Sequence, residues 1–268
     1  RGHATEADVV IMESTTGARP TGTPAADVDA EMRRIIEDCR HGRRTAVMPT
    51  FSVGRGQILV HHLARLAREG LLDEVPVYLD SPMAIRAGEL CVQHPTLLSA
   101  QAREMIARGH SPFDFDSLHC LWSRKHSLKV AGREGAGIVL AGSGFCDAGP
   151  VLHHLENSLG HDRGYVVFTG YVLPGSMAES LAEGTARRVR INGTELDVRA
   201  RITRLHGLSG HADSPQMIEW LSGSGHSPSV VVLNHGDNAA REGLAGRVRS
   251  VVSSTVAMPQ CNGQLELS

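Results

Sequence analysis

Three titratable side chains lie where open α/β sheets bind ligands, at the ends of strands or in loops that lead into helices. They are Glu13, His211 and His235. A carboxylate beside a histidine orients the imidazole, and a histidine can transfer a proton near neutral pH or ligate a metal ion. These residue types therefore indicate a general acid–base site or a metal site.

Each of the three also has a purely structural interpretation. Glu13 begins the motif E-S-T-T-G, where a carboxylate commonly caps the following turn. His211 lies in the loop motif S-G-H-A-D, and an isolated histidine in a loop is commonly a surface residue. His235 follows the apolar run V-V-V-L-N, which delivers it to a sheet edge as a metal ligand, a base or an ordinary hydrogen-bonded residue. Taken singly, each residue leaves both interpretations open.

Three glycine-rich turns, at residues 52–56, 142–145 and 170–176, are candidates for phosphate binding. Backbone N–H groups at the start of a helix attract anions, and Arg55 can add a bidentate contact. Each turn is also compatible with ordinary turn chemistry, because the chain has neither a Walker motif nor a G-x-G-x-x-G fingerprint.

Two histidine pairs, at 61–62 and 153–154, are predicted to be structural. Adjacent residues on a helix diverge by about 100°, and neither pair has a partner at four-residue spacing. Asp80 opens the motif D-S-P at a junction between a strand and a helix, where an acid, a hydroxyl and a proline more often form a cap than a catalytic group.

The composition is that of an ordinary globular protein. The 268 residues are 41% hydrophobic and 21% charged, and 27 Lys and Arg against 29 Asp and Glu give a net charge of −2. This balance excludes intrinsic disorder and supplies no global attraction to nucleic acid, although it permits a local basic cleft. No apolar run approaches the roughly 20 residues of a membrane span, so membrane insertion is disfavoured. Five cysteines without a C-x-x-C pair predict reduced thiols and a cytoplasmic protein.

The elements that must position these residues alternate between strands and helices. Strands are predicted over 7–12, 45–48, 75–79, 137–141 and 165–169, and helices over 28–39 and 57–69 and from near 149 and 174. This order predicts an α/β fold with a largely parallel sheet flanked by helices. From about Ala186 the pattern becomes a hairpin around Asn192 and Gly193, followed by a helix with Ser214 as its N-cap and by a strand over 230–233.

In their order along the chain, these motifs resemble the β-CASP branch of the metallo-β-lactamase-fold nucleases, which act on RNA and, in some members, on DNA. The resemblance rests on E-S-T-T-G at 13–17, P-T-F-S-V-G-R-G-Q at 49–57, D-S-P-M at 80–83, S-G-F-C at 143–146, H-H-L at 153–155, G-Y at 170–171, S-G-H-A-D at 209–213 and N-H-G-D at 234–237. The ordered set covers nearly the whole chain and is far more specific than any of its members.

The resemblance implies an insertion architecture. A β-CASP domain at residues 21–185 interrupts an αββα metallo-β-lactamase fold, to which residues 1–20 and 186–268 belong. In the family, two zinc ions hold a hydroxide that attacks phosphorus, and a glutamate orients the histidine that protonates the leaving oxygen. Here the catalytic roles fall to Glu13 and His211, and the metal-ligand role falls to His235.

The resemblance also implies that RNA is the partner and lies in a cleft between the two domains. Its phosphates are expected to contact Arg55, Ser143, Gly144 and Ser209. A homodimer is compatible with this arrangement, and no contact with a membrane is expected.

The chain departs from the family in its metal ligands. The family motif H-x-H-x-D-H should precede Glu13, but this chain contains no H-x-H. His235 alone cannot hold two zinc ions, since a catalytic zinc usually has about three protein ligands. We therefore expect this chain to be the C-terminal portion of a longer zinc-dependent ribonuclease, and to be inactive and nearly free of zinc by itself.

Two other functions remain open at this point. A catalytically silent β-CASP paralogue that binds RNA or partner subunits would account for the missing ligands. A nucleotide-binding α/β domain would account for the glycine-rich turns, although not for the order of Glu13, His211 and His235.

Overall fold

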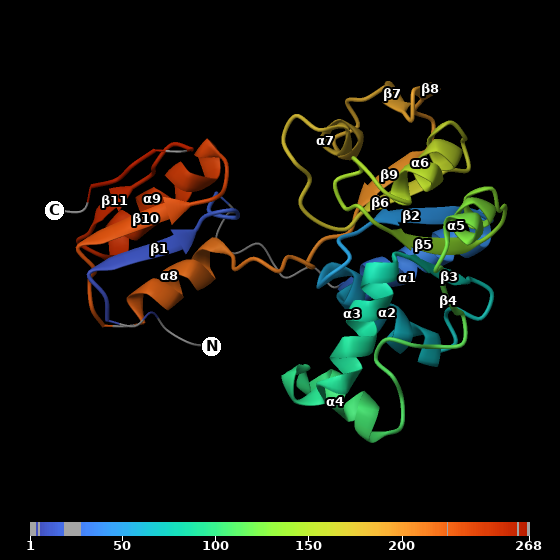
Figure 1. Cartoon of the computed structure of the whole chain (residues 1–268), viewed down its shortest axis with the longest axis horizontal. Helices are drawn as coiled ribbons and strands as arrows, with labels where there is room; N and C mark the ends of the chain where they lie inside the picture. The colour runs from blue at the N-terminus through green and yellow to red at the C-terminus, as the bar shows by residue number, and fades with distance from the viewer. Residues whose placement is uncertain (1–3, 5, 19–27, 224, 262, 267–268) are drawn as a thin grey trace. The chain divides into compact units, whose positions relative to one another are not determined.

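The computed structural model describes residues 4, 6–18, 28–223, 225–261 and 263–266. The chain divides into two compact units, a smaller one made of residues 1–25 and 210–268 and a larger one made of residues 26–209 (Figure 1). Two stretches far apart in the sequence thus build the smaller unit, as an insertion requires.

The larger unit is built on a six-stranded sheet with the order β4-β3-β5-β2-β6-β9, in which every neighbouring pair is parallel. The strands are β2 (Thr45–Pro49), β3 (Val77–Asp80), β4 (Leu118–Cys120), β5 (Gly137–Ala141), β6 (Tyr165–Phe168) and β9 (Arg201–Arg204). The predicted parallel α/β fold is confirmed.

Helices cover both faces of this sheet (Figure 1). They are α1 (Val28–Gly42), α2 (Arg55–Arg68), α3 (Pro82–Gln93), α5 (Arg124–Ala131), α6 (Val151–Leu159) and α7 (Met177–Ala182). A 3-10 turn at Pro95–Leu97 and the short helix α4 (Ala100–Ala107) follow α3 and lie away from the sheet (Figure 1). Along β2, Met48 packs in the core with α1 and α2, and Val47 packs in the core with α6 and α7. Burial on both faces explains why the central strands are continuous apolar runs.

The smaller unit holds a parallel three-stranded sheet with the order β1-β10-β11, and the two helices α8 and α9. These elements are β1 (Val9–Glu13), β10 (Val230–Asn234), β11 (Thr255–Ala257), α8 (Ser214–Ser222) and α9 (Asn238–Val251). Alternate strand residues such as Met12 and Leu233 pack with both helices. On β1, Ile11 lies between the buried residues Val10 and Met12, points to the opposite face of the sheet and is 67% exposed.

A hairpin of β7 (Arg188–Ile191) and β8 (Thr194–Asp197) confirms the predicted turn, because Asn192 and Gly193 both have a positive φ. The strand β9 that follows pairs with β6, so the structure groups residues 186–209 with the larger unit. The compact units therefore divide at residue 210. The domain segments 1–20, 21–185 and 186–268 stay a prediction.

One predicted helix cap was wrong. The N-cap of α8 is Asp213 and not Ser214, because the Asp213 carboxylate accepts a hydrogen bond from the Gln216 backbone at 2.9 Å. The Gln216 side chain accepts one from the Asp213 backbone at 3.2 Å, and the pair forms a reciprocal capping box. Within the described ranges, no helix is both long and apolar enough to cross a membrane.

Candidate functional site

The smaller unit brings Glu13 and His211 together. Glu13 ends β1, and His211 lies in the loop that leads into α8. The Nδ1 atom of His211 lies 2.9 and 3.1 Å from the two carboxylate oxygens of Glu13. A carboxylate that accepts the Nδ1 proton fixes the tautomer and leaves proton exchange to Nε2. The His211 side chain is 50% exposed, so a substrate can approach it.

Two contacts hold the backbone beside His211. The Thr16 hydroxyl donates to the carbonyl oxygen of Ala212, and Thr16 is buried. Asp213 is held by its capping box at the start of α8. The histidine is thus placed by β1 on one side and by a capped helix on the other.

His235 lies just past the end of β10 in a tight turn. His235 and Gly236 have φ values of 57° and 69°, which is left-handed backbone. The fully buried Ser14 hydroxyl lies 3.0 Å from the carbonyl oxygen of Asn234 and 2.9 Å from that of His235. A Cβ on Gly236 would lie 2.7 Å from the Ser14 carbonyl oxygen, so only glycine fits there. This turn fixes the backbone position of His235 at the end of β10.

The sheet register places Glu13 and His235 at the same edge. Glu13 pairs with Asn234 in the parallel ladder of β1 and β10, and His235 is the next residue. Parallel strands direct their carboxyl ends to one edge of a sheet, which is where ligands bind in this class of fold. The structure thus assembles Glu13, His211 and His235 within one unit.

The hydroxyl groups of Ser14 and Thr16 are structural supports of the site that the sequence analysis did not identify. Both belong to the motif E-S-T-T-G, in which the sequence analysis assigned a functional role only to Glu13. Their partners lie 221 and 196 residues further along the chain, at His235 and Ala212. A run of hydroxyl residues directly after a strand-end carboxylate is the signal that could have suggested such a role.

The described residues do not by themselves fit a zinc centre. Among them, no group of three or more His, Cys, Asp or Glu side chains is arranged to hold a metal ion. A catalytic zinc usually has about three protein ligands, so His235 needs further donors to act as one of them.

In the larger unit, loops at the carboxyl ends of β2, β5 and β6 meet at one edge of the sheet. The N–H of Thr50, after β2, donates to the carbonyl oxygen of Ala141 at the end of β5, at 2.9 Å. The Thr169 hydroxyl, after β6, donates to the carbonyl oxygen of Pro49 at 3.1 Å. These loops carry the three predicted phosphate-binding turns, which are therefore neighbours.

Arg55 is the first residue of α2, and its side chain lacks a full set of acceptors. Its Nη1 atom is buried without a partner among the described residues. A Cβ on Gly170 would lie 3.2 Å from its Nη2 atom, so the guanidinium packs against the glycine-rich turn after β6. Burial lowers the pKa of Arg55. A buried guanidinium is stabilised by an anion, which makes Arg55 the best-supported phosphate contact of the larger unit.

The structure gives less support to the remaining predicted phosphate contacts than to Arg55. The Ser143 hydroxyl donates to the Asp147 carboxylate, so it is already engaged within its own loop. Gly144 is buried, and a Cβ there would lie 3.0 Å from the Phe51 ring. Packing alone therefore explains why this residue is a glycine. Ser209 is an exposed residue of the larger unit, next to the division at residue 210. Contacts of these three residues with RNA stay predictions.

The motif D-S-P and His154, from the second histidine pair, have structural roles. The Ser81 hydroxyl accepts a hydrogen bond from the Ala84 backbone at 3.2 Å and caps α3, as predicted, with Pro82 at the first turn. Asp80 and His154 form a buried pair, with Oδ2 and Nε2 separated by 2.7 Å and side chains 3% and 2% exposed. This pair joins the end of β3 to α6.

Two family models match the sequence in consecutive segments. The Beta-Casp domain matches residues 56–181, and the Zn-dependent metallo-hydrolase RNA specificity domain matches residues 195–259. The chain belongs to the β-CASP family of metallo-β-lactamase-fold proteins. The resemblance inferred from the motifs is thereby confirmed, and an unrelated nucleotide-binding domain is excluded.

Relatives of this β-CASP chain include proteins with two different names. The chain is 35% identical over 236 residues to Ribonuclease TTHA0252 of Thermus thermophilus. This alignment covers 86% of the chain and 52% of that protein. The chain is 29% identical over 248 residues to transcription termination factor FttA of Methanosarcina mazei, in an alignment that covers 90% of the chain and 39% of that protein. The FttA of Methanothermobacter thermautotrophicus is 28% identical over 248 residues, with coverages of 90% and 38%. The chain thus spans about half or less of the length of these relatives.

Proposed function

We propose that this β-CASP chain is part of a metal-dependent ribonuclease in which Glu13 and His211 transfer the proton that the leaving oxygen requires. The observation that carries this proposal is the distance of 2.9 Å between Nδ1 of His211 and the Glu13 carboxylate, at the carboxyl edge of a parallel sheet. The name of the relative from Thermus thermophilus supports RNA as the substrate and hydrolysis as the reaction.

In the proposed step, protonated His211 donates from Nε2 to the leaving oxygen as its bond to phosphorus breaks. A water molecule supplies the oxygen that forms the new bond to phosphorus, and the proton that it loses passes to solvent. Glu13 keeps the imidazole in place through Nδ1 and stabilises its positive charge before the transfer. His211 regains its proton from solvent after each turnover.

Zinc is the metal that the description of the second family model supports. We assign His235 as one ligand, which requires further donors outside the described residues. We also propose that residues 1–20 and 186–268 belong to the metallo-β-lactamase fold and residues 21–185 to the β-CASP domain.

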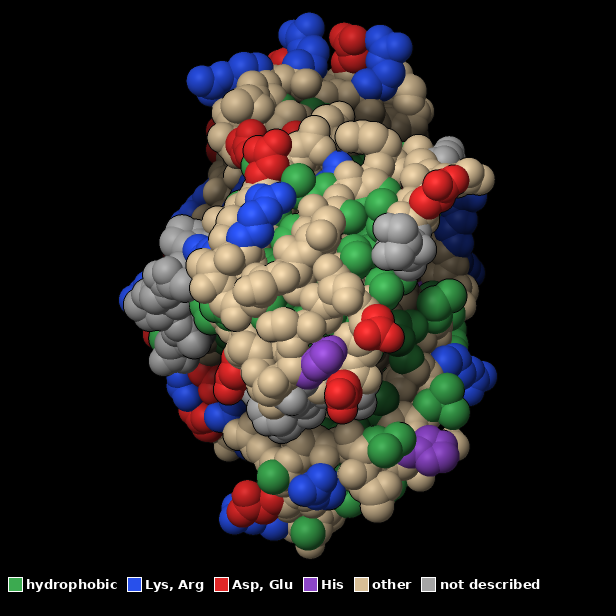
Figure 2. Space-filling model, turned by 90° about the vertical axis from the view of Figure 1, so that its left-hand side faces the viewer, with side chains coloured by type: hydrophobic (Ala, Val, Ile, Leu, Met, Phe, Trp, Pro, Cys, Tyr) green, Lys and Arg blue, Asp and Glu red, His purple; other side chains and the backbone are tan. Residues whose placement is uncertain are grey.

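RNA binding in this proposal depends on local groups and not on overall charge. Figure 2 shows acidic, basic and hydrophobic side chains interspersed on one face of the molecule, consistent with the net charge of −2. The unsatisfied guanidinium of Arg55 is the strongest local support for a phosphate contact. The five free cysteines support a cytoplasmic location, and a homodimer stays a prediction.

The test compares variants of the natural full-length protein in an RNA cleavage assay. His211→Ala should lower cleavage by roughly 10²–10⁴-fold, as expected for loss of a general acid, and should leave RNA affinity unchanged. His206→Ala is the matched control, because His206 is an exposed loop histidine of the larger unit. Unchanged cleavage in His211→Ala would remove this residue from the mechanism.

A second function is favoured by one observation. Since the described residues do not form a metal-binding group, a catalytically silent paralogue that binds RNA or a partner subunit also fits. If the zinc-supplemented full-length protein binds RNA but does not cut it, and His211→Ala changes nothing, the silent function holds.

A further inference from the structure

Helix α5 and the residues around it form a basic surface in a nearly neutral protein. Residues 117–133 include Arg124, Lys125, Lys129 and Arg133 and contain no Asp or Glu, although the whole chain has a net charge of −2. Lys125 and Lys129 are the only two lysines in the sequence. A local cluster of basic residues on one element is the electrostatic pattern of a surface that binds a polyanion.

The geometry of α5 directs both lysines to solvent. Ser127 is buried and Val130 packs against the core of the larger unit, so the side of the helix that carries them faces the protein. Lys125 and Lys129 lie one turn apart on the opposite side, and both are exposed. Like charges at this spacing weaken a helix slightly, so the stability of α5 does not account for the pair.

The charge of this surface is not balanced within the chain. Exposed arginines elsewhere in the larger unit have acidic partners, as in the hairpin, where Arg188 donates to the Asp197 carboxylate at 3.0 Å. Within the described ranges, neither Lys125 nor Lys129 forms an ion pair with an acidic side chain. Both ammonium groups are therefore available to an external anion.

An aromatic stack adjoins the C-terminal end of α5. The ring of His119, on the edge strand β4, stacks on the ring of Tyr78 with a centroid distance of 5.3 Å and an interplanar angle of 30°. The guanidinium carbon of Arg133 lies 5.8 Å from the Tyr78 centroid, and His119 is exposed. Basic groups beside an exposed ring suit the phosphates and unpaired bases of a nucleic acid, whereas an acidic protein would use only the charges.

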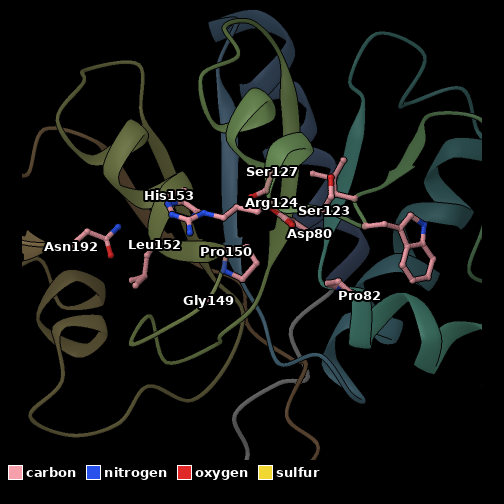
Figure 3. A pocket seen from close by; sticks show the side chains of 12 residues that line it. Asp80, Pro82, Ser123, Arg124, Ser127, Gly149, Pro150, Leu152, His153 and Asn192 are labelled. Atoms are coloured by element: carbon pink, nitrogen blue, oxygen red, sulfur yellow. The ribbon is translucent and has the colours of Figure 1, made fainter.

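This surface begins at the edge of the sheet where the predicted phosphate-binding turns lie. Helix α5 connects the parallel strands β4 and β5, so it runs from their carboxyl edge back to their amino edge. At its start, Arg124 and His153 line a pocket of about 390 Å³ beside Trp122 (Figure 3). At its end, Arg133 lies next to Gly137, the first residue of β5. A strand held at the carboxyl edge can therefore continue along α5.

We propose that the exposed face of α5, with Lys125, Lys129 and Arg133, binds the phosphates of single-stranded RNA and that His119 stacks on one of its bases. The surface would hold RNA outside the candidate site of Glu13 and His211. This inference rests on the proposed function for the choice of RNA as the nucleic acid.

The test measures RNA binding by the natural full-length protein in the presence of a chelator, which prevents metal-dependent cleavage. The probe is a fluorescein-labelled single-stranded oligoadenylate of about 20 nucleotides, longer than typical single-strand binding sites. Fluorescence anisotropy gives its Kd over a range of salt concentrations. The double variant Lys125→Gln/Lys129→Gln should bind at least about tenfold more weakly at low salt. Its slope of log affinity against log salt should be smaller by about 1.4, since each phosphate contact contributes about 0.7.

Two further variants separate charge from stacking. Arg188→Gln/Arg190→Gln is the matched control, because it removes the same charge from exposed side chains that are already paired within the hairpin, and it should change binding little. His119→Ala should weaken binding at least about fivefold and leave the salt slope unchanged, as expected for loss of a stacked base. Circular dichroism establishes that each variant is folded.

The proposal is overturned if the double lysine variant keeps the affinity and salt slope of the parent, or if the arginine control loses as much affinity. Unlabelled oligoadenylate should displace the probe far better than polyglutamate of equal charge. Equal displacement would indicate a surface for acidic proteins and would also overturn the proposal. Because no cleavage is measured, failure of this inference is distinguishable from failure of the proposed ribonuclease function.

Discussion

Glu13 and His211 are 198 residues apart in sequence, and Nδ1 of His211 lies 2.9 Å from Oε2 of Glu13. The contact depends on the parallel pairing of β1 with β10, which places the end of β1 beside the C-terminal segment. The candidate proton-transfer pair therefore exists only when both segments of the smaller unit are folded together.

The first prediction concerns Glu13. In the natural full-length protein, Glu13→Gln should lower RNA cleavage by about 10- to 100-fold, because the amide still orients His211 but no longer stabilises its positive charge. The loss should be smaller than that of His211→Ala, and the double variant should be no slower than His211→Ala alone. Losses that multiply would show that the two residues act independently.

The second prediction concerns the Ser14 hydroxyl. Ser14→Ala should lower the free energy of unfolding by about 0.5–1.5 kcal/mol, because the carbonyl oxygens of Asn234 and His235 lose the one hydroxyl that bridges them. Urea unfolding of the 268-residue chain measures this change. Ser250→Ala, at an exposed serine of α9 in the same unit, is the control and should change stability little. Equal stability of the two variants would contradict the bridging role.

The third prediction concerns the buried pair of Asp80 and His154. His154→Ala should destabilise the larger unit by about 3–5 kcal/mol, because it leaves a buried carboxylate without its partner. The double variant Asp80→Asn/His154→Ala should recover part of this loss in urea unfolding. His153→Ala is the neighbouring control and should be close to the parent chain. A double variant no more stable than His154→Ala would argue against an uncompensated charge.

The fourth prediction concerns two buried thiols. Burial raises the pKa of Cys39 and of Cys146 to about 12. Native protein at pH 8 should therefore leave both unmodified by a maleimide, while the exposed Cys261 reacts within minutes. Mass spectrometry of labelled peptides reads out each site, and labelling in urea should reach all of them. Rapid native labelling of Cys39 would contradict its burial.

The same shifts fix the sign of a pH dependence. An unfolded thiol loses its proton near pH 8.5, whereas the native thiols keep theirs up to about pH 12. The native state thus binds more protons over this interval, and stability should fall as pH rises from about 8.5. Urea unfolding at pH 8 and pH 10 should show a smaller decrease in Cys39→Ala than in the parent. An equal decrease would mean that Cys39 does not contribute.

The fifth prediction concerns metal content. After extensive dialysis, elemental analysis of the 268-residue chain should find far less than one zinc ion per molecule, because its described residues form no metal-binding group. About two tightly held ions would mean that this chain builds its own centre. His235 would then have partners that the present ligand assignment does not include.

Much of the fold could be predicted from local patterns in the sequence. The apolar runs around Met48 and over 137–141 predicted the buried parallel strands, and Asn192 with Gly193 predicted the hairpin turn. Between β3 and β5, only the start of a helix at Pro82 was predicted, because β4 has three residues and α3 exposes apolar side chains such as Leu90, which obscures its helical period.

The candidate site was predictable as a set of residues but not as a structure. Glu13, His211 and His235 stood out by type and position, whereas the supports given by Ser14 and Thr16 depend on partners about 200 residues away. Local sequence carries no information about such contacts, which form only in the folded chain. The pocket beside Trp122 was not anticipated for the same reason, since it joins three separate elements.

The division of the smaller unit between residues 1–25 and 210–268 also has a consequence for protein synthesis. A ribosome makes β1 early and β10 late, so the nascent chain carries Glu13 long before the strand that β1 requires has been translated. Until then only the larger unit, whose residues 26–209 are contiguous, has all of its chain available for folding. The candidate proton-transfer pair can therefore form only after β10 has been translated, and a nascent chain that ends before β10 does not carry it.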